Sequence, residues 1–237
     1  MTDTQRLPKY YRVKEVIMAE IDGLQPGAPL PDERTLAASF ETSRTTIRQA
    51  LQELSREGRI MRRQGHGTFV AEPKLTLPLR LSSHTEDMHE LGMEPSSRVL
   101  SVTDECADDT IGDALGIDVG DPITVISRVR LADGVPLALE INHLSQTRFP
   151  GIARLINDHV SLYEILVDDY SVTPHHALET IESAPATPEE AKLLETEIGT
   201  PMMLMTRQSF ESDGDAFEYV RSVYRGDRYR FATQLTT

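Results

Sequence analysis

Tryptophan is absent from this 237-residue chain, cysteine occurs once, and aromatic residues make up only 5% of the sequence. A lone cysteine, Cys106, excludes an intramolecular disulfide framework and agrees with a reducing compartment. No stretch approaches the ~20 consecutive apolar residues of a membrane helix, and residues 1–15 lack the apolar core of a secretory signal. We therefore expect a cytoplasmic protein without membrane attachment, with one large domain or two modest ones.

The charge is unevenly distributed along the chain. The net charge is −14, which by itself argues against a nucleic-acid partner. Residues 1–71, however, contain 11 basic and 9 acidic side chains, a net charge of +2, so the remainder carries −16. A mildly basic N-terminal part followed by a strongly acidic body indicates two domains with different partners.

The first 60 residues show three helical patterns. Apolar residues recur at near-four spacing in residues 9–24. After the break at residues 25–29, Asp32 can cap a short second helix, and Ser43 or Thr42 can cap a third, which ends before Gly58. Two short helices joined by a tight turn predict a helix-turn-helix.

A hairpin follows the third helix. Residues 60–63 and 68–70 are short β-like runs on either side of a Gly-containing turn. A hairpin directly after a recognition helix is a wing, so residues 1–71 predict a winged helix-turn-helix domain. Residues 72–78 contain two prolines and little pattern, and we expect a linker there.

Residues 79–237 predict a second domain of the α+β class. Strands are expected at 98–106, 123–131, 137–144, 202–210, 217–224 and 229–235, and helices at 85–91, 111–115, 151–156, 162–168 and 188–194. Turns at 132–134 and 212–215 join two pairs of strands into hairpins. Hairpins in series predict a mainly antiparallel sheet.

The candidate DNA-binding residues lie on the second and third helices and the wing. The first turns of a recognition helix face the major groove, where Arg reads guanine and Thr contacts thymine methyls or phosphates. The alternative is that these are ordinary solvated side chains. The candidates are Arg34, Ser43, Arg44, Thr45, Thr46, Arg48, Gln64, Gly65, His66, Gly67 and Thr68.

The second domain contains a candidate anion site. Arg128 and Arg130 are two apart on one expected strand, so both point to one face and suit a phosphate or carboxylate. Glu140 lies on the partner strand, and Glu218 and Tyr224 share a face of another. We expect a pocket with an anion-binding pair at one end and carboxylates at the other; cross-strand ion pairs on a solvated sheet face are the alternative.

The stretch LPDERTLAASFETSRTTIRQALQELSREGRIMRRQGHGTFV, residues 30–70, resembles the DNA-binding signature of the GntR family of regulators. The resemblance implies that the candidates above contact an operator, and that the protein binds inverted repeats as a homodimer. Residues 78–235 resemble the HutC-branch sensor domain, called UTRA, whose fold is similar to that of chorismate lyase. Within that branch the chain resembles the NagR and DasR group in LPKYY at 7–11, LSSHTEDM at 81–88, ETIESAPATPEEAKLL at 179–194 and VRSVYRGDRYRF at 220–231.

This resemblance implies an amino-sugar 6-phosphate as effector, from N-acetylglucosamine or glucosamine, and a repressor of amino-sugar genes that the effector releases from DNA. The phosphate would meet Arg128, Arg130, Ser161 and Tyr163, joined by Ser82 or Ser83. The sugar would meet Glu140, Glu218 and Tyr224.

Two other functions stay open at this point: a regulator of the same family that senses another sugar phosphate or a carboxylate, and an enzyme of chorismate lyase-like fold. We find no catalytic nucleophile–base pair and expect no metal or cofactor. The pair His175 and His176 has no Cys or His partner at metal-binding spacing.

Overall fold

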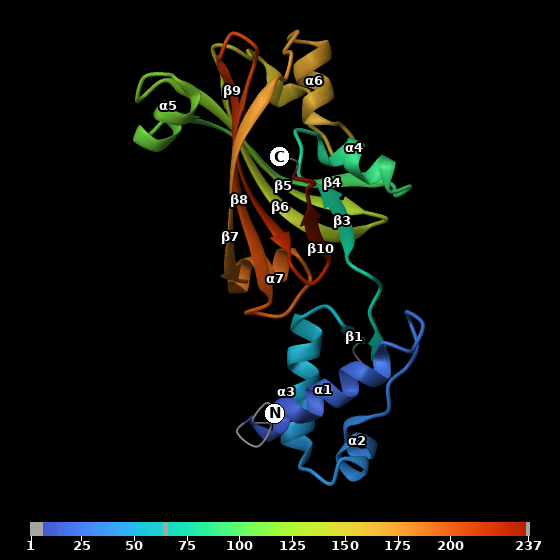
Figure 1. The fold of residues 1–237 in the computed structure, drawn as a ribbon. Coiled ribbons are helices and arrows are strands. Elements are labelled where there is room, and N and C mark those ends of the chain that lie inside the picture. The colour runs from blue at the N-terminus through green and yellow to red at the C-terminus, as the bar shows by residue number, and fades with distance from the viewer. Residues whose placement is uncertain (1–6, 64–65, 236–237) are drawn as a thin grey trace. The chain divides into compact units, whose positions relative to one another are not determined.

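The computed structural model describes residues 7–63 and 66–235. The chain forms two compact units, which we call the head (residues 1–75 and 226–230) and the sensor unit (residues 76–225 and 231–237). Figure 1 shows the helical head and the sheet-rich sensor unit. Among the described residues, no helix has the length and apolar character needed to cross a membrane.

The head has the three helices and the hairpin that the sequence predicts. They are α1 (Lys9–Ile21), α2 (Glu33–Ser39), α3 (Arg44–Arg56), β1 (Ile60–Arg63) and β2 (Gly67–Val70). The strands β1 and β2 are antiparallel. Asp32 caps α2 by accepting the Thr35 amide at 2.7 Å, and Ser43 caps α3 by accepting the Thr46 amide at 3.2 Å. The helix-turn-helix and its wing are therefore present.

One apolar cluster holds the head together. Its buried members come from all three helices and the hairpin and include Ile17, Leu36, Ile47, Leu51, Leu54 and Ile60. The expected extension of α1 to Leu24 is wrong: the helix ends at Ile21, and Leu24 is 45% exposed. Gly23, two residues after Ile21, disfavours a longer helix through its backbone freedom.

The sensor unit is built on a six-stranded, fully antiparallel sheet with the order β4-β5-β6-β9-β8-β7. Its strands are β4 (Pro95–Cys106), β5 (Pro122–Ala132), β6 (Val135–Ser145), β7 (His176–Pro185), β8 (Pro201–Phe210) and β9 (Ala216–Arg225). The β5–β6 and β8–β9 hairpins turn where the sequence predicts them. The α+β class is confirmed.

Helices cover both faces of this sheet. They are α4 (His84–Glu90), α5 (Asp109–Leu115), α6 (Leu162–Asp168) and α7 (Pro188–Leu193), with a short 3-10 helix, η1 (Ile152–Arg154). On β5, Val125 packs in the cluster of α5 and Val129 in that of α7, whereas Ile126 packs in the cluster of α6. Figure 1 shows α4 and α6 on one side of the sheet and α5 on the other. The even-numbered residues of β5 thus face α4 and α6.

Two strands were not expected from the sequence. β7 is an edge strand, and its apolar residues Leu178 and Ile181 are 63% and 41% exposed, so it has no clean alternation of buried and exposed positions. β3 (Leu75–Pro78) lies in the segment expected to be a linker and pairs with β10 (Tyr229–Ala232). Of the expected linker, only residues 72–74 keep an irregular backbone, and β10 ends before the expected residue 235.

The head core yields a prediction about stability. Leu54 is fully buried in it, so Leu54→Ala removes packed apolar contacts and should destabilise the head by about 2–5 kcal/mol. The matched variant Leu24→Ala removes an exposed side chain and should change little. Amide hydrogen exchange of α1 and α3 in the full-length protein, measured in increasing urea, gives the free energy of unfolding of the head in each variant. Equal losses of stability in Leu54→Ala and Leu24→Ala would contradict the assigned core.

Candidate functional site

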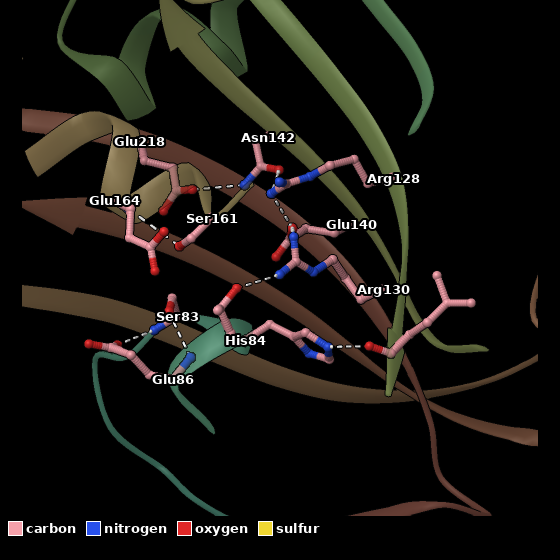
Figure 2. Close-up of polar contacts among 12 residues, drawn as sticks. Ser83, His84, Glu86, Arg128, Arg130, Glu140, Asn142, Ser161, Glu164 and Glu218 are labelled. Carbon is pink, nitrogen blue, oxygen red and sulfur yellow. Dashed lines mark hydrogen bonds and ion pairs between the residues drawn. The ribbon is translucent and has the colours of Figure 1, made fainter. Parts of the chain in front are cut away.

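One pocket of the sensor unit collects every effector-binding candidate named from the sequence. Its lining includes Ser82, Ser83, Arg128, Arg130, Glu140, Ser161, Tyr163, Glu218 and Tyr224. These residues come from β5, β6, β9, α6 and the segment leading into α4, which are far apart in sequence. Strand pairing brings them together, and Figure 2 shows several of them converging.

The register of the sheet explains the convergence. Arg128 on β5 lies opposite Glu140 on β6, which lies opposite Ser222 on β9. One row along, Arg130 lies opposite Ala138, and Ala138 opposite Tyr224. Side chains two residues apart on a strand share a face, so these rows form the floor of the pocket.

The charges are arranged differently from the expectation. Glu140 does not lie at the far end from the arginines. Its Oε2 is 2.7 Å from Arg128 Nη2 and 3.9 Å from Arg130 Nη1. The alternative of ion pairs on a solvated face is also wrong, because the arginine side chains are only 2% and 4% exposed. Burial raises the pKa of Glu140, but the two arginines outweigh it, and the net shift is downward.

Arg128 has hydrogen-bonding capacity to spare. Its Nη2 donates to Glu140 and, at 3.3 Å, to Asn142 Oδ1. Its Nε and Nη1 are buried without a hydrogen-bond partner among the described residues. Buried N–H groups of a guanidinium are costly when unsatisfied, so this side of the pocket is suited to an anionic acceptor.

The three serines differ in their availability. Ser83 and Ser161 cap α4 and α6, accepting the amides of Glu86 at 3.1 Å and Glu164 at 3.4 Å (Figure 2). An accepting hydroxyl keeps its own proton, which it can donate to an anion. Ser82 instead donates its proton to Asp87 at 2.8 Å. Ser83 is therefore a better anion donor than Ser82.

The other side of the pocket is a hydrogen-bond network around Glu218. Asn142 Nδ2 donates to its Oε1 at 2.8 Å, and the Tyr163 hydroxyl donates to its Oε2 at 3.0 Å. Tyr163, expected near a phosphate, thus directs its proton at a carboxylate. Burial, and then the charge of Glu140, raise the pKa of Glu218. Oε1 accepts the one hydrogen bond from Asn142 among the described residues, so it has a lone pair with which to accept a ligand hydroxyl or amide.

His84, at the start of α4, is a buried and neutral part of the lining. Burial and the charge of Arg130 lower its pKa to about 3. Its Nε2 lies 3.2 Å from the Leu131 carbonyl oxygen, which only accepts, so Nε2 carries the proton (Figure 2). Its Nδ1 is then an acceptor.

Sequence reasoning missed several pocket residues, namely Arg80, Asp87, Asn142, Glu179, Met205 and Arg207. Asn142 lies two residues from Glu140 on the same strand, so the period of two was sufficient to find it. Arg207 and Glu179 required the pairing of β8 with β7, which the sequence did not reveal.

Some of the DNA-binding candidates in the head have exposed side chains, as a DNA contact requires, and others are partly buried. Arg34, Arg44 and Thr45 are exposed at the starts of α2 and α3. Ser43 and Thr46 hydrogen-bond each other at 2.9 Å within the cap of α3. Arg48 is exposed, but Glu33 holds its guanidinium, with Nη2 2.9 Å from Oε2.

The wing is described in part. Gln64 and Gly65 lie outside the described residues. His66 and Gly67 are exposed, and Gly67 has φ +110°, a conformation that other residues rarely adopt. Thr68 is half-buried, and its carbonyl accepts the Leu30 amide at 2.8 Å.

Two protein families match the two units. Residues 9–70 match the family described as bacterial regulatory proteins, gntR family. Residues 90–230 match the UTRA domain. The expected family and its branch are confirmed.

Characterised relatives match over nearly the whole length. The chain is 39% identical over 230 residues to the transcriptional repressor NagR of Bacillus subtilis, covering 95% of this chain and 93% of NagR. It is 38% identical over 231 residues to the repressor PhnF of Mycolicibacterium smegmatis, covering 97% and 93%. It is 31% identical to the histidine utilization repressor of Pseudomonas putida over 94% and 90% of the two chains.

A solved structure of one of these relatives supports the same family. The crystal structure of PhnF from Mycobacterium smegmatis matches with a TM-score of 0.67 at 36% identity, covering 95% of this chain and 99% of that one. These relatives are regulators, which decides against an enzyme of chorismate lyase-like fold. The chain belongs to the gntR family of bacterial regulators, in the HutC branch with a UTRA domain, and is a DNA-binding transcriptional repressor with a small-molecule effector.

Proposed function

We propose that this repressor controls genes of amino-sugar uptake and catabolism, and that an amino-sugar 6-phosphate releases it from its operator. The observation on which the proposal rests is the buried guanidinium of Arg128, with Nε and Nη1 unpartnered among the described residues, beside Arg130 and the hydroxyls of Ser83 and Ser161. A phosphate supplies acceptors for several such donors at once.

The rest of the pocket suits the sugar. Glu218, Tyr224 and Asn142 line the same pocket and offer both acceptors and donors for hydroxyl and amide groups. The 39% identity to NagR over 95% of the chain also supports an amino-sugar effector. Effector binding then favours a sensor arrangement with lower operator affinity, a population shift between two states.

A second candidate is a repressor of the same kind whose effector is a different phosphate or carboxylate. The 38% identity to PhnF, nearly equal to that with NagR, favours keeping it in the test. Both candidates share the anion-binding side of the pocket and differ only in what the Glu218 side recognises.

We further propose that the protein is a homodimer that binds an inverted repeat, because two recognition helices then enter successive major grooves. Sedimentation of the full-length protein, alone and with DNA selected from a random-sequence pool, tests this. One dimer on two symmetric half-sites is expected. A monomer on a single half-site would contradict it.

The effector is tested by titrating N-acetylglucosamine 6-phosphate and glucosamine 6-phosphate into the complex with that selected operator at fixed salt. Unphosphorylated N-acetylglucosamine and inorganic phosphate are the controls. Release by either sugar phosphate at concentrations where both controls are inactive supports the proposal. Release by another phosphate or carboxylate alone would favour the second candidate.

Removing the anion-binding pair should abolish the response. Arg128→Gln and Arg130→Gln should each weaken sugar-phosphate binding by about tenfold or more, because each removes a charge-assisted hydrogen bond from a buried site. Arg221→Gln is the matched control: Arg221 is on β9 of the same sheet but not in the pocket lining. Calorimetric titration provides the affinities, and an unchanged affinity in both pocket variants would overturn the assignment.

The recognition helix yields a prediction for DNA. Arg44→Ala should weaken operator binding by about 5- to 150-fold, as expected for one lost base contact of 1–3 kcal/mol. Arg56→Ala removes the same charge at the opposite end of α3 and should have a much smaller effect. Fluorescence anisotropy with the selected operator measures both. Equal losses would mean that only overall charge matters.

A further inference from the structure

Arg207 lies in the pocket lining but belongs neither to the anion-binding pair nor to the Glu218 network. It stands on β8, directly opposite Glu179 on β7. Its Nε donates to Glu179 Oε1 at 2.8 Å, and both side chains are mostly buried, 17% and 15% exposed. Burial lowers the pKa of Arg207. The hydrogen bond to Glu179 and the charge of that carboxylate raise the pKa by more, so the net shift is upward and the guanidinium stays charged.

The other two nitrogens of Arg207 hold a different part of the chain. Nη1 donates to the Ser82 carbonyl at 3.3 Å, and Nη2 donates to the Arg80 carbonyl at 3.5 Å. Residues 79–83 form neither helix nor strand, and they connect β3 to α4. The Arg207 guanidinium therefore contacts Glu179 on the neighbouring strand and, on its other side, the irregular segment that contains Ser82 and Ser83.

This segment follows β3, the first strand of the sensor unit along the chain. Pro78 at the end of β3 and Phe231 on β10 also line the pocket. A displacement of the segment 79–83 can therefore be passed along a few residues of the chain to β3.

The acceptors of Arg207 are unequal. Glu179 is charged, whereas the two carbonyls are neutral, and hydrogen bonds to charged oxygens are roughly twice as strong as those to neutral ones. An anion in the same pocket competes well for Nη1 and Nη2 in surroundings of low dielectric constant. The Nε contact to Glu179 can persist while the two terminal nitrogens exchange partners.

We propose that Arg207 is a positioning residue that couples effector binding to the segment 79–83. In the empty pocket it holds the segment through the carbonyls of Arg80 and Ser82. An anionic effector takes over these donors and frees the segment, which starts the change that lowers operator affinity. The proposal rests on the proposed effector response, but its first step can be measured without any sugar phosphate.

The first test is amide hydrogen exchange over residues 79–83 in the full-length protein without ligand. Arg207→Gln should speed this exchange by about five- to tenfold, because the two carbonyl contacts are lost. Arg207→Lys keeps the charge, but one ammonium cannot replace the planar fork that joins three acceptors, so it should speed exchange too. The control Arg221→Gln should not. Unchanged exchange in both Arg207 variants would overturn the proposal.

The second test separates coupling from stability. Operator affinity is measured with and without N-acetylglucosamine 6-phosphate for wild type, Arg207→Gln and Glu179→Gln. We expect the operator affinity of the variants without effector to fall toward that of wild type with effector, and the ratio of the two affinities to fall toward one, while the sensor unit stays folded. A merely structural role would melt the sensor unit, yet leave this ratio intact in the folded fraction. A wild-type ratio in Arg207→Gln overturns the proposal.

A failure of the effector assignment would look different. If wild type ignores both sugar phosphates, the proposed effector is wrong, and inorganic phosphate at millimolar concentration becomes the probe. Faster exchange at 79–83 in wild type on adding phosphate, absent in Arg207→Gln, then supports the role of Arg207. No phosphate effect on that segment in wild type contradicts it. If Arg207→Gln does not fold, Arg207→Lys takes its place in each measurement.

Discussion

The placement of Glu140 between Arg128 and Arg130 is the interaction on which the sensor unit depends. Removing charges from water is costly, and a buried ion pair offsets that cost only when its geometry is good and its remaining donors are satisfied. Here two guanidinium groups share one carboxylate, so the cluster keeps a positive excess. This positive excess is the physical basis for proposing an anionic ligand at the pocket.

Much of this site could be predicted because it depends on local regularities. Arg128 and Arg130 share a face by the period of two, and Ser83 and Ser161 precede their helices as caps. The partner strand of Glu140 could be predicted, but its place opposite Arg128 could not, since the register between β5 and β6 shifts between Arg130 and Leu131. Arg207 and Glu179 were out of reach because β7, as an edge strand with exposed apolar residues, shows no regular pattern.

The head was easier to predict, since caps, breaks and apolar spacing all agree there with one small fold. Its side-chain pairing was not predictable. Glu33 on α2 holds Arg48 on α3, and its Oε1 lies 3.9 Å from Arg62 on the wing strand. On the surface that we predict to face DNA, this carboxylate orders the two arginines and lowers the net positive charge.

The strand β3 ties the segment that leads into the pocket to the end of the chain. Residues 75–78 pair with β10, residues 229–232, which is the last strand among the described residues. These two strands form a sheet of their own, apart from the six-stranded sheet. A chain that stopped before Tyr229 would leave the backbone donors and acceptors of β3 without their partner strand. The C-terminal residues are therefore part of what holds the segment that follows β3 in place.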